Sequence, residues 1–277
     1  MFKTYIFGEG VSKNARSPII WNTISSLFSI NSKMTCLDTT EGNFESLLMN
    51  VVQEEFFIGG LLGSPLKSHK ALATLKKDHL SEASNSVNCI FREDAIWCGT
   101  TFDGDGALKA ILAEVNPLNF KNVFILGSGP VARAINKSLD NWDLNNKLNI
   151  EIVSRRMQAA DKSSEVKIYS YNHFYQNIKS NNLIINATKL GSPSYNDTPV
   201  NYTEFLLAGK GSYYFDVNYG ITLPLGTQIA HEIGIGCSDG KMMNLYQAIL
   251  GYLQVHKSIS IKLDFDLIFE QLSTCDI

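Results

Sequence analysis

The stretch VFILGSGPVARA, residues 123–134, decides the fold class of the second half of the chain. Four apolar residues precede Gly127 and Gly129, and a helix-forming run follows, so the stretch predicts a strand, a tight turn and a helix. Such a turn presents backbone N–H groups and the positive end of a helix dipole to a diphosphate. Ala132 stands where a third glycine often occurs. The stretch therefore predicts a dinucleotide site, with a plain tight turn of an α/β sheet as the alternative.

The end of the next predicted strand favours one dinucleotide over the other. It reads VSRR, and Ser154, Arg155 and Arg156 stand where proteins that bind NAD usually place an Asp or Glu on the ribose 2′-hydroxyl. Two guanidinium groups suit a 2′-phosphate and stack on adenine. We therefore expect NADP, with a solvated basic loop as the alternative. Downstream, INAT at 185–188 closes another predicted strand at the sheet edge where α/β proteins bind ligands.

Strand-like and helix-like patterns alternate along the whole chain, which predicts an α/β protein with two α/β domains. In the first hundred residues we expect strands at 3–8, 33–40 and 56–62, helices at 17–28, 44–53 and 68–77, and a hairpin at 88–99. Further helices are expected at 103–115, 241–255 and 264–272. No long linker separates the two series, so the boundary near residue 100 is expected to be tight.

Composition excludes several classes of function. The net charge is −3 and the sequence pI is about 6.0, which argues against a nucleic-acid partner and against a basic membrane-binding patch. Apolar runs such as 56–62 are far shorter than a membrane span, and the N-terminus lacks the features of a signal peptide. The five cysteines and five histidines are scattered, so neither a disulfide framework nor a metal site is expected. We expect a soluble, cytoplasmic protein.

Nine short motifs occur in the same order as in the shikimate dehydrogenase family, which the chain resembles over nearly its whole length. ARSP is similar to S-x-S-P, GLLGSPLK to N-V-T-x-P-x-K, SVNC to A-V-N-T, and GTTFDGDG to G-x-N-T-D-x-x-G. GSGPVAR, SRR, INATKLG, FDVNYGITLPL and DGKMMNLYQA resemble the remaining five. The resemblance implies a substrate-binding domain at 1–101, a Rossmann NADP-binding domain at 102–238, and C-terminal helices at 239–277 that return to the first domain.

The resemblance also implies a reaction, in which hydride passes between NADP(H) and a small cyclic hydroxy or keto acid. Lys67 and Asp103 match the family's catalytic pair, in which a lysine ammonium supplies the proton that an alkoxide needs and a carboxylate orients it. Substrate contacts are implied at Ser17, Leu61, Gly63, Asn88, Tyr219 and Gln247. Cofactor contacts are implied at Gly127, Ser128, Gly129, Pro130, Val131, Ser154, Arg155, Arg156, Asn186, Ala187, Thr188, Val217, Gly240 and Met243. Members of the family are monomers or homodimers.

Several departures from the family's motifs cluster on the substrate side. Ala15 replaces the first serine of S-x-S-P, Leu61 and Gly63 replace the asparagine and threonine of N-V-T, and Thr101 and Phe102 replace N-T. Three lost hydrogen bonds would cost roughly 2–5 kcal/mol, on the order of 30-fold to several thousand-fold in affinity. We therefore expect a substrate that is less hydroxylated than shikimate or differently substituted.

Three other functions stay open from the sequence. The chain could be a non-catalytic sensor that binds NADP(H) or a metabolite, although a sensor has no need of the Lys67 and Asp103 pair. It could be a true shikimate dehydrogenase with a divergent pocket. A methylenetetrahydrofolate dehydrogenase or a glutamyl-tRNA reductase shares the two-domain plan but lacks this combination of motifs.

Overall fold

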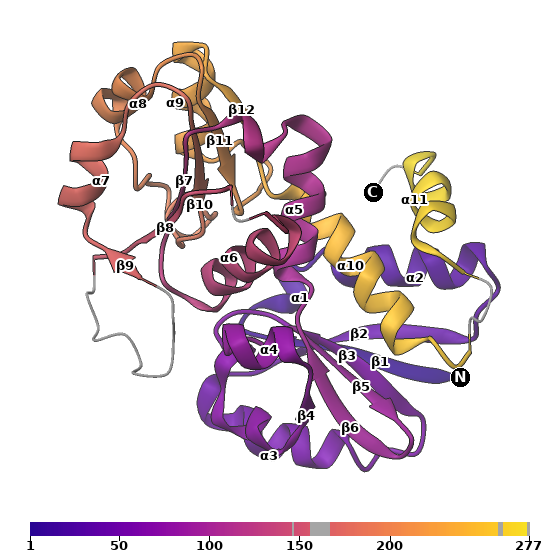
Figure 1. The fold of residues 1–277 in the computed structure, drawn as a ribbon. Helices are drawn as coiled ribbons and strands as arrows, with labels where there is room; N and C mark the ends of the chain where they lie inside the picture. Colours follow the sequence, from indigo (N-terminus) through magenta and orange to yellow (C-terminus); the bar gives the residue numbers. More distant parts are fainter. Residues whose placement is uncertain (146, 156–166, 260–262, 276–277) are drawn as a thin grey trace. The chain divides into compact units, whose positions relative to one another are not determined.

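The computed structural model describes residues 1–145, 147–155, 167–259 and 263–275. It confirms the predicted α/β class and divides the chain into two compact units, Met1–Asp103 with Asn244–Ile277, and Gly104–Met243 (Figure 1). The boundaries expected from the sequence, after residues 101 and 238, lie slightly earlier along the chain than the observed ones, which follow residues 103 and 243. Phe102 packs on the core of the first unit, and Gly240 lies directly against Val217 within the second.

The first unit is built on a mixed six-stranded sheet with the order β2-β1-β3-β5-β6-β4. The strands are β1 (Phe2–Gly8), β2 (Ser32–Asp38), β3 (Phe57–Leu62), β4 (Lys76–Lys77), β5 (Cys89–Glu93) and β6 (Ile96–Thr100). The helices are α1 (Val11–Asn14), α2 (Ser17–Leu27), α3 (Glu41–Val51), α4 (His79–Ser84), α10 (Lys241–Val255) and α11 (Phe265–Ser273), with 3₁₀ turns η1 (Leu66–Ser68) and η2 (Lys70–Thr74). The predicted hairpin is confirmed as β5 and β6, and Asp94 and Ala95 join them with φ angles of 48° and 65°, as a two-residue hairpin turn requires.

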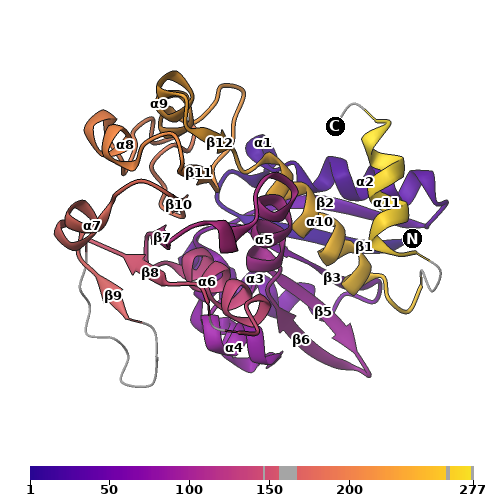
Figure 2. The ribbon, with the colours of Figure 1, turned by 45° about the horizontal axis from the view of Figure 1, so that its top comes forward.

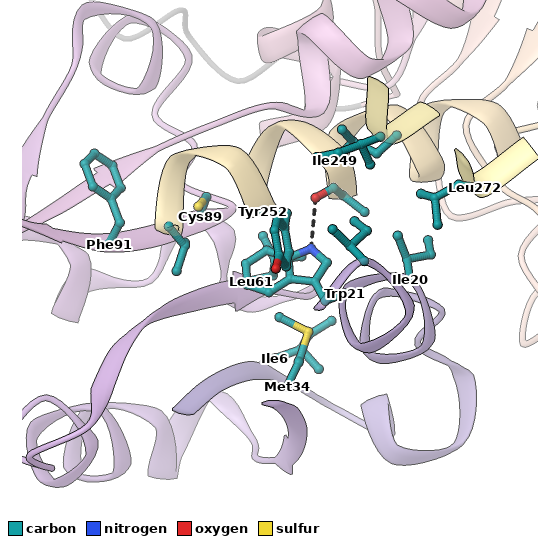
Figure 3. Packing of buried hydrophobic residues seen from close by; sticks show 14 of the residues in the cluster. Ile6, Ile20, Trp21, Met34, Leu61, Cys89, Phe91, Ile249, Tyr252 and Leu272 are labelled. Carbon is teal, nitrogen blue, oxygen red and sulfur yellow. Dashed lines mark hydrogen bonds between the residues drawn. The ribbon is translucent and has the colours of Figure 1, made fainter. Parts of the chain in front are cut away.

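Helices cover both faces of this sheet, because neighbouring strand residues point to opposite sides. Ile6 and Leu61 belong to the core that α2, α10 and α11 share on one face, whereas Phe7 and Leu62 belong to the core with α3 and the 3₁₀ turns on the other. The helices on the two faces can be followed in Figures 1 and 2. Figure 3 shows the first of these cores, in which Trp21 donates a hydrogen bond from Nε1 to the carbonyl oxygen of Ala248 at 2.9 Å. This core fixes the part of α10 that follows residue 243 on the sheet.

The prediction of a helix at 68–77 is wrong. The structure has η1, η2 and the short strand β4 there. Leu66, Leu72 and Leu75 are buried in one core, and their spacing by multiples of three suits a 3₁₀ turn, which has three residues per turn. The side chain of His69 also accepts a hydrogen bond from the backbone N–H of Ala71 at 3.1 Å, which starts a new turn.

The second unit is built on a parallel sheet with the order β12-β11-β10-β7-β8-β9. The strands are β7 (Asn122–Leu126), β8 (Ile150–Val153), β9 (Ile168–Tyr169), β10 (Asn182–Asn186), β11 (Tyr213–Asp216) and β12 (Gly236–Ser238). The helices are α5 (Asp103–Glu114), α6 (Pro130–Trp142), α7 (Tyr171–Asn177), α8 (Tyr202–Ala208) and α9 (Leu225–Ile233), with a 3₁₀ turn η3 (Pro117–Asn119). This is the strand order of a Rossmann fold, which binds ligands at the carboxyl ends of the strands where the order reverses, here β7 and β10.

The core of the second unit forms between buried strands and the apolar faces of its helices. Every residue of β10 is buried, and α7, α8 and α9 contribute Phe174, Phe205 and Ala230 to the core on one face (Figure 2). On the other face α6 packs against β7 and β8. Helix α5 lies close to α6, because a Cβ atom at Gly104 would come within 2.2 Å of the Ala134 carbonyl oxygen.

Candidate active site

Lys67 and Asp103 form an ion pair in the first unit. The Lys67 Nζ atom lies 2.8 Å from Oδ1 and 2.7 Å from Oδ2 of Asp103. The Asp103 side chain is 2% exposed and that of Lys67 is 17% exposed. A carboxylate buried this deeply requires a charged or hydrogen-bonding partner. Lys67 supplies that partner and keeps some of its side chain accessible to a ligand.

Asn88 connects this ion pair to α10. Its Nδ2 group donates to Asp103 Oδ1 at 3.0 Å and to Gln247 Oε1 at 2.8 Å, and its Oδ1 atom accepts from the backbone N–H of Phe102 at 2.9 Å. Asn88 is 1% exposed, so its amide serves mainly to orient its neighbours. Lys67, Asp103, Asn88 and Gln247 therefore form one hydrogen-bonded group, although they are widely separated in the sequence.

The loop that carries Lys67 is held on both sides. It leaves the carboxyl end of β3, beside the end of β1, where the strand order of the parallel part of the sheet reverses. The backbone N–H of Gly63 donates to the Phe7 carbonyl oxygen, and that of Val87 donates to the Lys67 carbonyl oxygen, both at 2.7 Å. These two bonds fix the backbone on which the Lys67 side chain stands.

The motif comparison placed Leu61 at a substrate contact, and the structure contradicts that placement. It does not line an open site, because its side chain is 2% exposed and lies in the core beside Trp21 and Tyr252 (Figure 3). Helix α10 approaches so closely that a Cβ atom at Gly251 would lie 2.9 Å from Leu61 Cδ2. The expected loss of a substrate hydrogen bond at Leu61 is therefore wrong.

Two other expected substrate contacts differ in access, because Gly63 is partly exposed and Ser17 is buried. Gly63 is half-buried, and a Cβ atom there would lie 3.3 Å from the Phe7 carbonyl oxygen and 3.4 Å from Val11 Cγ1. Ser17 begins α2 and is 3% exposed. Within the described residues, no hydrogen bond joins either of them to the group around Lys67.

The glycine turn of the second unit fits a dinucleotide diphosphate. Gly127 has a φ of 109°, and a Cβ atom there would lie 2.9 Å from the Ala187 carbonyl oxygen, so the fold requires glycine. A Cβ atom at Gly129 would meet nothing within 4 Å, which leaves open space over the turn. Helix α6 starts at Pro130, and its first N–H groups have no partners within the helix. Ser128 and Val131, also expected to contact the cofactor, are half-buried on the same turn.

The end of β8 carries the residues expected to select the nucleotide. The Ser154 Oγ atom lies 3.0 Å from Ser128 Oγ and is 8% exposed, so it ties β8 to the glycine turn. Arg155 is exposed, and Arg156 lies outside the described residues. Within the described residues, one exposed guanidinium group, that of Arg155, therefore follows Ser154.

The remaining expected cofactor contacts follow β10 and β11. Ala187, Thr188 and Val217 are half-buried. Asn186, however, is fully buried and donates to the Leu190 carbonyl oxygen and to Asp216 Oδ2. Its side chain therefore holds neighbouring residues in place and does not face a ligand.

Three further expected residues belong to the same unit. Gly240 is buried, and a Cβ atom there would lie 2.0 Å from the Val217 carbonyl oxygen, so no side chain fits. Met243 is 6% exposed and Tyr219 is half-buried.

The sequence analysis missed Asp216 as an individual residue of the site. It is fully buried at the end of β11, and burial raises the pKa of its carboxyl group to about 6, although hydrogen bonds from Asn186, Asn218 and Tyr214 oppose that rise. The signal was present, because an ionisable residue at the end of an apolar strand is rarely buried without a specific partner.

Two further searches concern other kinds of function. Across the described parts of the chain, no helix has both the length and the apolar character that a membrane crossing requires. In the same residues, no group of three or more His, Cys, Asp or Glu side chains is arranged to hold a metal ion.

Comparisons with known proteins confirm the resemblance predicted from the motifs. No protein-family model matches the chain. It is 28% identical over 243 residues to an NADP(+) shikimate dehydrogenase of Methanococcoides burtonii, covering 87% of both chains. It is 27% identical over 269 residues to one from Pelagibacter ubique, covering 94% of this chain and 95% of that protein.

Solved structures show the same fold. Shikimate 5-dehydrogenase of Thermus thermophilus, in complex with NADP(H) and shikimate, superposes with a TM-score of 0.81 at 20% identity, over 99% of both chains. The chain is therefore similar in sequence to NADP(+) shikimate dehydrogenases over most of its length, and it shares their two-unit fold.

Proposed function

We propose that the protein is an NADP-dependent oxidoreductase of the shikimate dehydrogenase type, which transfers hydride between NADP(H) and a small cyclic hydroxy or keto acid. The observation that carries the proposal is the Lys67–Asp103 pair with Asn88 and Gln247 bonded to it. The proposal is supported by relatives named NADP(+) shikimate dehydrogenases and by the Thermus thermophilus protein's complex with NADP(H) and shikimate. The fit of the glycine turn to a diphosphate supports a dinucleotide cofactor.

Lys67 is the proposed proton donor. When bound, NADPH supplies the hydride that reduces a ring carbonyl. A lysine ammonium has three N–H donors, and the two oxygens of Asp103 engage two of them, so one donor remains for the substrate oxygen. The alkoxide that forms takes its proton from Nζ. Asp103 holds the ammonium in place, and Asn88 fixes Asp103 and Gln247 so that the pair needs little rearrangement when substrate binds.

We propose that shikimate itself is not the preferred substrate. Because Leu61 lies in the core, two of the three expected hydrogen-bond losses remain, at Ala15 and Gly63. Together they would cost roughly 1–3 kcal/mol, on the order of 5- to 150-fold in affinity. Ala15 also packs its methyl group against the core of the first unit. A ring acid with fewer hydroxyl groups, or with an apolar substituent beside Gly63, would lose less.

The experiment that tests the proposal compares Lys67→Ala with Lys70→Ala. Lys70 is 80% exposed in a surface pair with Glu45, so its loss controls for removing a lysine from the same segment. With a cyclic keto acid and NADPH we expect Lys67→Ala to lower kcat by about 10²- to 10⁴-fold and Lys70→Ala to leave it unchanged. The Kd for NADP⁺ should be the same in all three proteins, because the expected cofactor contacts lie in the second unit.

Two results would contradict the proposal. Equal turnover by Lys67→Ala and the wild type would remove Lys67 from the chemistry. Binding of NADP⁺ without turnover of any ring acid would favour a non-catalytic sensor, for which loss of Lys67 has no consequence.

A further inference from the structure

Asp216 is a fully buried carboxylate whose two oxygens are both engaged. Oδ2 accepts from Asn186 Nδ2 at 2.9 Å and from the Tyr214 hydroxyl at 3.0 Å. Oδ1 accepts from the backbone N–H of Asn218 at 2.9 Å and from its Nδ2 group at 2.8 Å. Four donors therefore converge on one side chain, from β10, from β11 and from the loop that follows β11.

The partners of Asp216 hold two loops together. The β10 loop, residues 187–191, is held by Asn186, which accepts from the Thr188 N–H and hydroxyl groups at 3.0 and 2.7 Å and donates to the Leu190 carbonyl oxygen at 2.8 Å. The β11 loop, residues 217–219, is held by Asn218, whose Nδ2 group lies 3.0 Å from the carbonyl oxygens of Thr188 and Leu190. Asp216 is bonded to both asparagines and so links the loops.

The hydrogen-bond donors around position 216 require a carboxylate there. An ionised carboxylate accepts on both oxygens, whereas an amide accepts on one side and donates on the other. Asn186 and Asn218 each present a side-chain N–H₂ donor to Asp216, one on each oxygen. An amide at position 216 would direct its own donor at one of these groups, and that loop would lose its attachment.

We propose that Asp216 is a positioning residue, which holds the β10 and β11 loops in the arrangement that presents Thr188 and Val217 to the cofactor. Thr188 and Val217 are half-buried on these loops, whereas Asp216 has no exposed surface, so it acts through the two asparagines. The assignment rests on the proposed NADP-dependent function. Burial raises the pKa of Asp216 to about 6, and three of its partners oppose the rise, which keeps the carboxyl group ionised at neutral pH.

The test uses Asp216→Asn in the full-length protein, with Tyr214→Phe as the matched control. Tyr214→Phe removes one of the four donors but keeps the carboxylate and both loop attachments. Hydrogen–deuterium exchange is measured without nucleotide. We expect amides of the β10 and β11 loops to exchange about ten-fold faster in Asp216→Asn, while β7 and α6 stay unchanged, and we expect Tyr214→Phe to leave both loops protected.

Nucleotide binding supplies the second readout. The Kd for NADP⁺ should rise about ten-fold in Asp216→Asn and stay near the wild-type value in Tyr214→Phe. Unchanged exchange in the two loops would overturn the positioning role, and so would an increase spread equally over the whole second unit. Normal binding by both the wild type and Asp216→Asn would overturn the role of Asp216 alone. Failure of the wild type to bind NADP⁺ would overturn the proposed function together with this assignment.

Discussion

Replacing Leu61 with asparagine, the residue of the family motif, should unfold the first unit more easily and should not improve shikimate binding. Leu61 is 2% exposed between β3 and α10. Losing a buried leucine side chain costs about 1.5–3 kcal/mol, and burying an amide without a partner costs roughly 1–3 kcal/mol more. The sum, roughly 2.5–6 kcal/mol, is a large part of the stability of an ordinary domain, about 5–15 kcal/mol.

Thermal and urea unfolding of the wild type, Leu61→Asn and Leu61→Met measure this effect. Leu61→Met conserves volume and should cost less than about 1.5 kcal/mol, so it separates loss of packing from loss of leucine itself. Tryptophan fluorescence measured in a Trp142→Phe background reports on the first unit, because Trp142 lies in the second unit and Trp21 lies in the same core as Leu61 (Figure 3). A Leu61→Asn protein with wild-type stability and tighter shikimate binding would refute the placement of Leu61 in the core.

Three further predictions concern the substrate, pH and the nucleotide. Restoring two hydroxyl groups with Ala15→Ser and Gly63→Thr should lower the KM for shikimate by about 5- to 150-fold, and an unchanged KM would show that neither position faces the substrate. His256 is fully buried, and burial lowers its pKa to about 4. Because the unfolded histidine titrates near 6.5, the wild type should lose stability relative to His256→Gln as pH falls from 6.5 to about 4, by up to about 3 kcal/mol. The raised pKa of Asp216 changes stability with pH in the opposite direction, but it does so equally in the wild type and in His256→Gln, so its effect cancels when their urea midpoints are compared. Midpoints that change in parallel with pH in the two proteins would contradict the prediction for His256. Arg155→Ala should weaken NADP⁺ binding by about 10-fold or more without changing the Kd for NAD⁺, and equal losses for both would contradict a 2′-phosphate contact.

Periodicity and turn chemistry predicted most of the fold. The long helix expected at 241–255 is α10 as observed, and the glycine turn at 127–129 stands between β7 and α6 as expected. These elements follow from local patterns that a single sequence displays, because a buried strand and an amphipathic helix have different repeats. The hairpin of β5 and β6 followed for the same reason.

The sequence could not predict which face of the sheet each side chain of β3 points to, as Leu61 illustrates. Lys3 pairs with Phe57 but Thr4 pairs with Gly59, so one residue of β3 is bulged out of the pairing. The bulge reverses the alternation of side chains. Phe57 and Leu61 therefore lie in opposite cores although their spacing predicts one face. A motif comparison gives a position along the chain and does not say which way its side chain points.

The site was predicted as separate residues, and the structure supplies their connections. The sequence gives no indication that Asn88 bonds both Asp103 and Gln247, because the three residues come from distant segments. The four donors around Asp216 are hidden from sequence reasoning for the same reason. Such networks depend on how strand ends meet, which tertiary packing decides.

We propose that this chain reduces or oxidises a small ring acid with NADP(H). The most direct test is the steady-state rate of the wild type with NADPH and a panel of cyclic keto acids, and with NADP⁺ and the matching hydroxy acids, shikimate included. We predict a kcat/KM of about 10⁴ M⁻¹ s⁻¹ or more for at least one ring acid, and a lower value for shikimate. Absence of turnover with every acid would contradict the enzymatic function, and shikimate as the best substrate would contradict the altered specificity.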